Sequence, residues 1–168
     1  MNLQAHEQSK CSLAAEVLQF WGTLRLRATG ISMLPTLWPG DLLNIQSRGS
    51  EQVQAGDIVL YIREGRFFVH RIASKSSADG QVFLIARGDC MSQQDPAIRE
   101  TELLGTVTEV RRNGALLAPT LKLSPFRLIF AWMLCHWNLF QRVALRLHAR
   151  RRSSADSDFA FLVGRAVL

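Results

Sequence analysis

Cysteine is scarce in this chain of 168 residues, which contains only Cys11, Cys90 and Cys135. An odd, widely spaced set of this kind does not predict a disulfide framework. The CxxC and HxxxH spacings typical of a zinc site are also missing. We therefore expect no metal and no other cofactor. Nothing in the surroundings of Cys90 requires it to be a nucleophile.

Long apolar runs are missing too. No stretch of 18 or more apolar residues occurs, so a membrane-spanning helix is not predicted. The first ten residues are polar and lack the basic-then-apolar layout of a secretory signal. Hydrophobic residues make up 48% of the chain and charged residues 20%, which is typical of a globular protein of one domain with a core.

Acidic residues are absent from a strongly basic stretch near the C-terminus. The net charge is +6, and this stretch carries Arg142, Arg146, Arg150, Arg151 and Arg152. Without them the remainder is close to neutral, so the basic character belongs to a tail and not to a whole surface. Such a patch fits contact with anionic lipid, or a solvated helix face. We expect no nucleic-acid partner, because the β region lacks the aromatic–basic interleaving of single-strand binders.

The middle of the chain has the pattern of a β domain. Apolar or alternating runs bounded by turn residues predict strands at 23–29, 42–46, 57–63, 66–73, 81–86 and 104–111. Asn113-Gly114 is a two-residue hairpin signal. Residues 12–21 predict a short amphipathic helix with Ser12 as N-cap and Gly22 after its end. Because no helices are interleaved, we predict a mainly β fold, a coiled antiparallel sheet or barrel-like domain with a short N-terminal helix.

The composition changes towards the C-terminus. Ser124-Pro125 precedes a stretch over 126–148 that is rich in Leu, Phe and Trp, and a serine N-cap with proline at the first helical position predicts an amphipathic helix there. We therefore divide the chain into a β domain with its N-terminal helix, 1–118, and a C-terminal amphipathic basic helix and tail, 119–168. Residues 126–152 are a candidate for contact with a membrane surface. Packing on the β domain or on a partner is the alternative.

Three ordered segments hold the residues with chemical potential. Residues 29–41 place Ser32 in a glycine-preceded bend, residues 66–72 place His70 on a predicted strand, and residues 86–96 contain Asp89 and Asp95. A serine hydroxyl is a poor nucleophile unless a neighbouring base takes its proton. An imidazole can accept and return that proton near neutral pH. The three segments together therefore favour nucleophilic catalysis by serine.

His70 has two competing interpretations. Phe68 and Ile72 share its strand face, and a histidine among apolar neighbours is by itself often a core residue. The rival base is lysine, but the chain has only Lys10, Lys75 and Lys122. A lysine base must be buried to lose its proton at neutral pH, whereas Lys75 lies in a polar run that we interpret as a solvated loop.

Together the three segments resemble type I signal peptidases and, more distantly, the LexA/UmuD self-cleaving peptidases. A Ser-Met-x-Pro box, a Val-His-Arg box and a Gly-Asp box with a second Asp six residues later occur in this order in the serine–histidine variant of archaea and the endoplasmic reticulum. The resemblance covers residues 23–110. It implies a serine-type endopeptidase that cuts exported precursors after small residues, with Ser32 as nucleophile and His70 at the position of the base.

The resemblance also implies an acid and an oxyanion site. Asp89 and Asp95 both match the acid box; we favour Asp95 for orienting His70 and give Asp89 a supporting role in the same loop. The backbone N–H of Ser32 is the first expected oxyanion donor. Gly30 stands where signal peptidases usually have a serine, and Thr29 offers a nearby hydroxyl, so the second donor stays unassigned.

The expected partner is a precursor protein or peptide, bound as an extended strand beside the strands before Ser32 and around His70. The expected location is cytoplasmic membrane-associated, with a cytoplasmic location as the alternative. Two rival functions stay open: a cytosolic LexA/UmuD-like regulatory or self-cleaving peptidase, and a non-catalytic binding module on the same fold.

Overall fold

The structure is a computed structural model that describes residues 3–78, 80–119, 126, 129, 131, 133 and 144–148. An N-terminal helix, α1 (Leu3–Trp21), precedes seven strands, and a short turn of 3-10 helix (Ser50–Gln52) lies between the second and third. The strands are β1 (Thr23–Arg27), β2 (Leu42–Ser47), β3 (Ile58–Arg63), β4 (Arg66–Ala78), β5 (Gln81–Arg87), β6 (Leu103–Arg112) and β7 (Ala115–Leu117).

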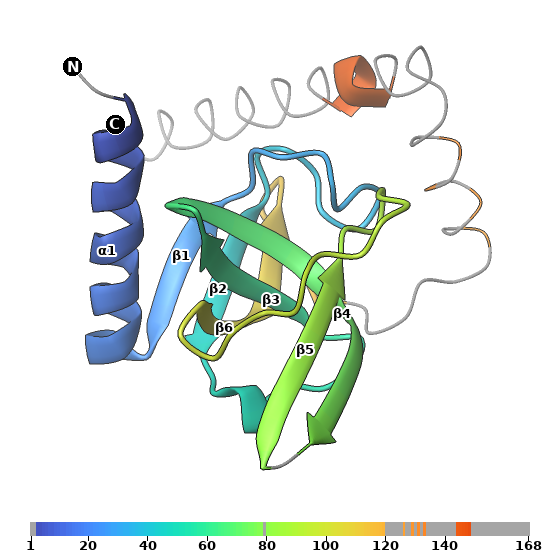
Figure 1. Cartoon of the computed structure of the whole chain (residues 1–168). Coiled ribbons are helices and arrows are strands. Elements are labelled where there is room, and N and C mark those ends of the chain that lie inside the picture. Colours follow the sequence, from blue (N-terminus) through green and yellow to red (C-terminus); the bar gives the residue numbers. More distant parts are fainter. Residues whose placement is uncertain are drawn as a thin grey trace.

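All seven strands belong to one antiparallel sheet. Their order is β1-β2-β6-β3-β4-β5, with β7 paired to β6. Figure 1 shows α1 standing beside β1, at one end of the coiled sheet. The predicted mainly β antiparallel fold with an N-terminal helix is confirmed. Because β1 and β5 stand at opposite ends of the order, the described strands do not close into a barrel.

Two tight hairpins fix the register of the sheet. Glu64-Gly65 joins β3 to β4 with φ angles of 52° and 70°, and Asn113-Gly114 joins β6 to β7 with 47° and 80°. Positive φ at both central residues matches the right-handed twist of the flanking strands, which explains the glycine and asparagine there. The predicted Asn113-Gly114 hairpin is confirmed. The other hairpin places His70 directly opposite Val59.

The sheet buries both of its faces around β3. Ile58 and Leu60 point into one apolar cluster, which also contains Leu18 of α1, whereas Val59 and Tyr61 point into a second cluster on the other face. Each fully buried aliphatic side chain of this kind contributes about 1.5–3 kcal/mol. The residues next to β3 therefore stand beside both apolar clusters.

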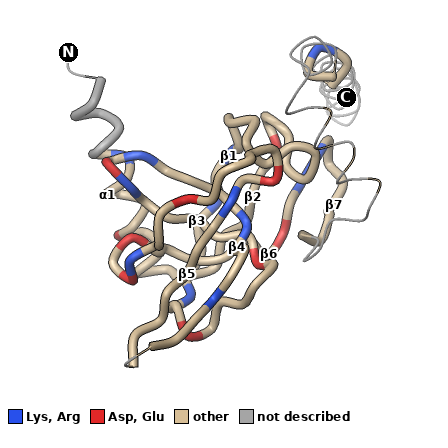
Figure 2. The backbone as a smooth tube through the Cα atoms, turned by 45° about the vertical axis from the view of Figure 1, so that its right-hand side comes forward, with Lys and Arg blue, Asp and Glu red and all other residues tan. Residues whose placement is uncertain are grey.

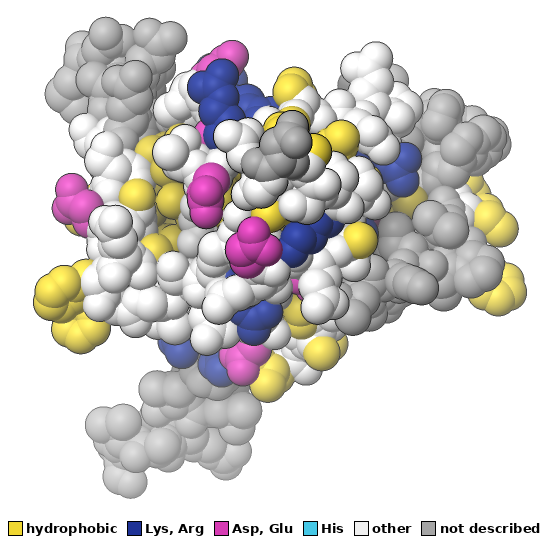
Figure 3. Space-filling model, turned by 60° about the horizontal axis from the view of Figure 1, so that its bottom comes forward, with side chains coloured by type: hydrophobic (Ala, Val, Ile, Leu, Met, Phe, Trp, Pro, Cys, Tyr) yellow, Lys and Arg dark blue, Asp and Glu magenta, His cyan; other side chains and the backbone are white. Residues whose placement is uncertain are grey.

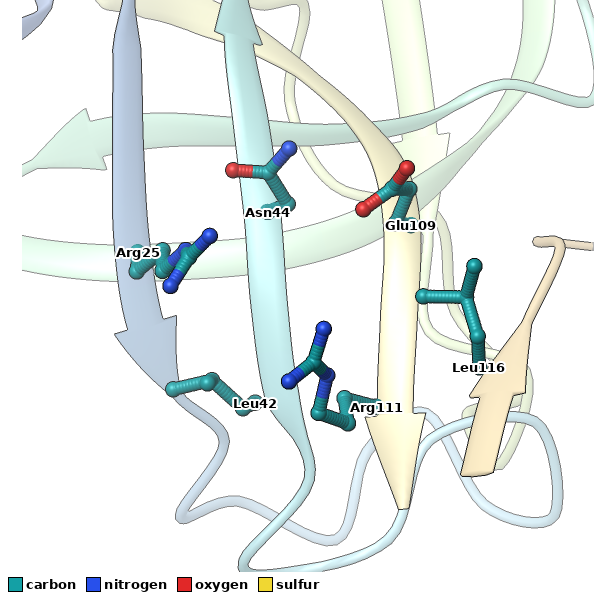
Figure 4. Close-up of a pocket in the computed structure, with 6 residues that line it drawn as sticks. All are labelled: Arg25, Leu42, Asn44, Glu109, Arg111 and Leu116. Carbon is teal, nitrogen blue, oxygen red and sulfur yellow. The ribbon is translucent and has the colours of Figure 1, made fainter. Parts of the chain in front are cut away.

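The outward face of β1, β2 and β6 is polar. Arg25, Asn44 and Glu109 form one cross-strand row, and Figure 4 shows them with Arg111 around a small hollow. The hollow has a volume of about 20 Å³, room for a single water, so it is not a candidate ligand site. Figure 2 shows basic and acidic residues interspersed along the described backbone, and Figure 3 shows them side by side on one face of the molecule.

The helix and β4 are both longer than predicted. Helix α1 begins at Leu3, not at residue 12, so the prediction of Ser12 as N-cap is wrong. Residues 3–11 lack an apolar period but consist largely of good helix formers. Gly22 ends the helix as expected, with a φ of 70° and its N–H bonded to the carbonyl of Leu18.

The loop predicted around Lys75 is in fact strand. Residues Ser74–Ala78 continue β4 and pair with β5 as a two-stranded ribbon. Their polar side chains reflect the exposure of this ribbon, where no core face demands alternation. The Lys75 ammonium donates to the carbonyl oxygens of Glu51 at 2.7 Å and Val53 at 2.9 Å.

The predicted C-terminal helix and the boundary at 118/119 fall largely outside the described residues. Those positions of 126–148 that are described are helical. Ala131 is buried, and the ring of His148 stacks on Trp38 with ring centroids 4.7 Å apart. Among the described helices, none combines the length and the hydrophobicity needed to cross a bilayer. Membrane contact by 126–152 stays a prediction.

Candidate active site

Ser32 lies in the loop between β1 and β2. The loop folds into successive turns, in which the N–H of Leu34 donates to the carbonyl of Ile31 and that of Leu37 to Met33. Met33, Leu34 and Leu37 are all buried. The apolar run after the serine therefore anchors the loop in the protein interior and fixes the backbone at Ser32.

His70 is carried by the centre of β4 and is only 4% exposed. Its Nε2 lies 3.0 Å from the Oγ of Ser32. The rings of Phe68 and Tyr61 approach the imidazole edge-on, with centroids 6.0 and 6.2 Å away. This packing holds the imidazole in place while leaving one ring nitrogen directed at the serine.

Asp95 completes a hydrogen-bonded series. Its Oδ2 lies 2.6 Å from the Nδ1 of His70, and its backbone N–H donates to the carbonyl of Ala86 at 2.8 Å. An ionised carboxylate can only accept, so Nδ1 carries the proton and Nε2 is left to accept from the Ser32 hydroxyl. The three side chains thus have the connectivity of a Ser–His–Asp triad.

Asp89 lies in a different environment. The Arg71 guanidinium donates to both of its carboxylate oxygens, at 2.8 and 2.9 Å, and the Thr36 hydroxyl donates to Oδ2. Its side chain is 3% exposed. The ion pair links β4 to the loop between β5 and β6 (88–102), here called the acid loop. The Thr36 hydrogen bond links the acid loop to the loop between β1 and β2 (28–41), here called the serine loop. The structure therefore places Asp95 against His70 and Asp89 against Arg71.

The acid loop touches the serine loop through its backbone. The N–H of Cys90 donates to the carbonyl of Ser32 at 2.7 Å. A Cβ atom at residue 88 would lie 2.7 Å from that same oxygen and 3.0 Å from the Cγ of Met91. Only glycine allows this approach. Cys90 thus contributes its main chain to the position of Ser32.

A cavity of about 660 Å³ lies at the Ser32–His70–Asp95 series. Ser32, His70 and Asp95 line it, together with Thr29 and Gly30, the two candidate sources of a second oxyanion donor. Most of its remaining lining is apolar and comes from β1, β4 and the serine loop, with Leu26, Ala28, Met33, Leu37, Phe67, Phe68 and Val69. Five of the predicted site residues therefore gather at one cavity, whereas Asp89 is not part of its lining.

Tyr61 also belongs to this site, although it is not among the residues predicted from the sequence. Its hydroxyl donates to the Oδ2 of Asp95 at 3.0 Å and lies 3.4 Å from the Nδ1 of His70. Burial and the negative charge of Asp95 raise the pKa of Tyr61 far above its ordinary value. A buried phenol needs a hydrogen-bond partner, so the one available signal was a tyrosine within the apolar run of β3, whose first four residues are buried.

The lysine alternatives do not match this site. The ammonium of Lys75 is bound to two backbone carbonyls away from Ser32. Lys10 of α1 lines the cavity but is exposed, whereas a neutral lysine base requires burial. Lys122 lies outside the described residues.

The comparisons with known proteins agree with the fold. Residues 3–108 match the family described as Peptidase S24-like, a range that covers more than half of the chain and contains Ser32, His70 and Asp95. No curated protein matches the chain. The family shares its serine-peptidase type of fold with LexA, UmuD and signal peptidase I. This chain therefore belongs to the Peptidase S24-like family.

Proposed function

We propose that this protein is a serine endopeptidase that cleaves exported precursor proteins after small residues, as type I signal peptidases do. The observation that carries the proposal is the series Ser32–His70–Asp95, joined at 3.0 and 2.6 Å. The family match supports a peptidase in general. A histidine base supports the signal-peptidase reading, because the serine–histidine variant of that family is the one that the three sequence boxes resemble.

The geometry suggests the sequence of steps. Ser32 Oγ attacks the scissile carbonyl while His70 Nε2 takes its proton, and Asp95 stabilises the imidazolium that forms. His70 then returns the proton to the leaving amine, and water hydrolyses the acyl-enzyme by the reverse transfers. The backbone N–H of Ser32 would donate to the developing oxyanion, and Thr29 and Gly30, which line the same cavity, are the candidates for the second donor.

The substrate would bind as an added strand. Residues 67–70 of β4 pair with β3 on one side, and β5 takes over on the other side only from Arg71 onward. The last residues of β1 line the opposite wall of the cavity. An extended peptide between these two edges would gain main-chain hydrogen bonds and present a carbonyl to Ser32.

The test is cleavage of fluorogenic peptides that carry an Ala-x-Ala sequence. We expect the wild type to cut after the second alanine, and Ser32→Ala or His70→Ala to lose about 10⁴-fold or more in kcat, because triad members act as a unit. Ser76→Ala, which removes an exposed hydroxyl on the β4–β5 ribbon, is the matched control and should keep full activity. Full activity in Ser32→Ala would disprove the proposal.

A LexA/UmuD-like regulatory or self-cleaving peptidase is the second candidate, favoured by the family match itself. The two candidates are separated by mass spectrometry of the purified protein after incubation. Fragments that form in the wild type but not in Ser32→Ala, without cleavage of any peptide, would favour self-cleavage. No turnover of either kind would favour a binding module.

A further inference from the structure

Two hydrogen-bond donors converge on one oxygen of Asp95. The Nδ1 of His70 lies 2.6 Å and the hydroxyl of Tyr61 lies 3.0 Å from the same Oδ2. We propose that Tyr61 is a positioning residue, whose hydroxyl fixes the Asp95 carboxylate so that it holds His70 in the tautomer that accepts the Ser32 proton. This inference rests on the proposed peptidase function.

The donor roles follow from the shared acceptor. A carboxylate oxygen has two lone pairs, so it can accept from Tyr61 and from His70 together. Tyr61 and Nδ1 are 3.4 Å apart, but both are then donors and do not bond each other. The phenol therefore acts on the imidazole only through the carboxylate. Without it, the orientation of Oδ2 depends on His70 alone.

The phenol is itself held rigidly. Tyr61 is 1% exposed and its ring stacks on Phe68, with centroids 5.4 Å apart. The raised pKa of its hydroxyl keeps the proton in place over the pH range in which an imidazole can act as base. A donor that neither moves nor ionises is suited to orienting a carboxylate.

A second residue of β3 holds the same loop. Arg63, two residues on from Tyr61, donates to the carbonyls of Pro96 at 3.2 Å and Ala97 at 3.0 Å, directly after Asp95. Its guanidinium lies 5.4 Å from the centre of the Tyr61 ring and pairs with Glu102 at 2.7 Å. Two side chains of β3 therefore hold the acid loop. Tyr61 binds the side chain of Asp95, and Arg63 binds the main chain that follows it.

The experiment compares Tyr61→Phe with wild type in peptide cleavage and in the rate at which a fluorophosphonate labels Ser32. Phenylalanine keeps the ring and removes only the hydroxyl. We expect kcat and the labelling rate to fall about tenfold, the effect of losing one hydrogen bond, with KM within twofold. The control is Thr106→Val, which removes a buried hydroxyl that has no partner among the described residues. This variant should leave kcat, KM and the labelling rate unchanged.

A double-mutant cycle tests whether the effect passes through the carboxylate. In an Asp95→Ala background, Tyr61→Phe should slow labelling no further. If Tyr61→Phe leaves kcat within twofold of wild type, raises KM alone, or adds its full effect to Asp95→Ala, the inference is wrong. If Ser32→Ala is as active as wild type, the peptidase proposal itself has failed.

Fluorination provides a measurement that does not depend on the stability of a variant. Tyr61 is the single tyrosine of the chain, so growth on difluorotyrosine changes this position alone. The fluorines lower the phenol pKa, and an ionised Tyr61 would repel Asp95. The other titratable or charged groups that face Tyr61 are His70, Arg63 and Glu102. We expect the alkaline decline of kcat to move to lower pH. An unchanged pH profile would contradict the role.

Discussion

Two aspartates that lie six residues apart in the chain have different partners in the fold. Asp95 faces an imidazole, whereas Asp89 is neutralised by the Arg71 guanidinium in a nearly closed environment. A buried ion pair of this kind destabilises a protein strongly when one partner is removed, because the other charge is left unpaired. Replacing Asp95 should therefore lower mainly the activity, whereas replacing Asp89 should lower mainly the stability of the fold.

Replacement of each aspartate by asparagine tests this difference. Asp95→Asn should lower kcat by about 10³–10⁴-fold, because an amide can stabilise the wrong histidine tautomer, while the urea midpoint stays near that of wild type. Asp89→Asn should lower the free energy of unfolding by about 3 kcal/mol. Peptide cleavage and urea unfolding, measured on both variants, give the comparison. The reverse pattern would assign the triad to Asp89.

At the residue scale, the sequence predicts some members of the candidate site and not others. Ser32 and His70 could be selected because their residue types and order carry a chemical meaning before any folding. The choice between Asp89 and Asp95 depends on which carboxylate the loop turns towards the imidazole. Tyr61 could not be selected, because its role depends on a partner 34 residues away.

At the scale of elements, burial decides what can be predicted. Most strands were found because one or both faces are buried and their apolar residues follow the sheet period. The continuation of β4 through Ser74–Ala78 was missed because its residues are polar and mostly exposed. The start of α1 was missed because residues 3–11 lack an apolar period. A strand segment that is held mainly by backbone hydrogen bonds, without a buried face, has no characteristic apolar pattern in its sequence.

The contact between the acid loop and the serine loop supplies a prediction at this scale. Gly88→Ala places a Cβ 2.7 Å from the Ser32 carbonyl, so the two loops must separate and the Cys90 hydrogen bond must lengthen. Because displacements near 1 Å are costly in catalysis, we expect kcat to fall about 100-fold. Gly49→Ala is the matched control, since its Cβ meets nothing within 4 Å. Equal rates for the two variants would show that the loops adapt freely.

At the scale of the whole molecule, Tyr61 couples folding to alkaline pH. Its pKa is raised in the folded protein, above the ordinary value of about 10 that it regains on unfolding. Below that pH both states keep the proton and stability is unaffected. At higher pH the unfolded state ionises first, so the free energy of unfolding should fall as pH rises further.

Absorbance at the tyrosinate band measures this coupling without ambiguity, because the chain has one tyrosine. The folded protein should show no tyrosinate around pH 10 to 11, and the band should appear together with loss of structure in circular dichroism. Tyr61→Phe should lose this contribution to the alkaline instability. Reversible ionisation of Tyr61 near pH 10 in the folded state would contradict the burial described for it.

The partners of His70 come from distant parts of the chain. Ser32 lies 38 residues before it and Asp95 lies 25 residues after it, on loops that are brought together when β6 joins β2 to β3 and when β4 and β5 are paired. A nascent chain that has emerged only as far as β5 contains a serine and a histidine but no acid to orient them. On the proposed function, the catalytic series is therefore complete only in a chain that has been made beyond Asp95 and has folded, so a chain still being synthesised would not cleave its neighbours.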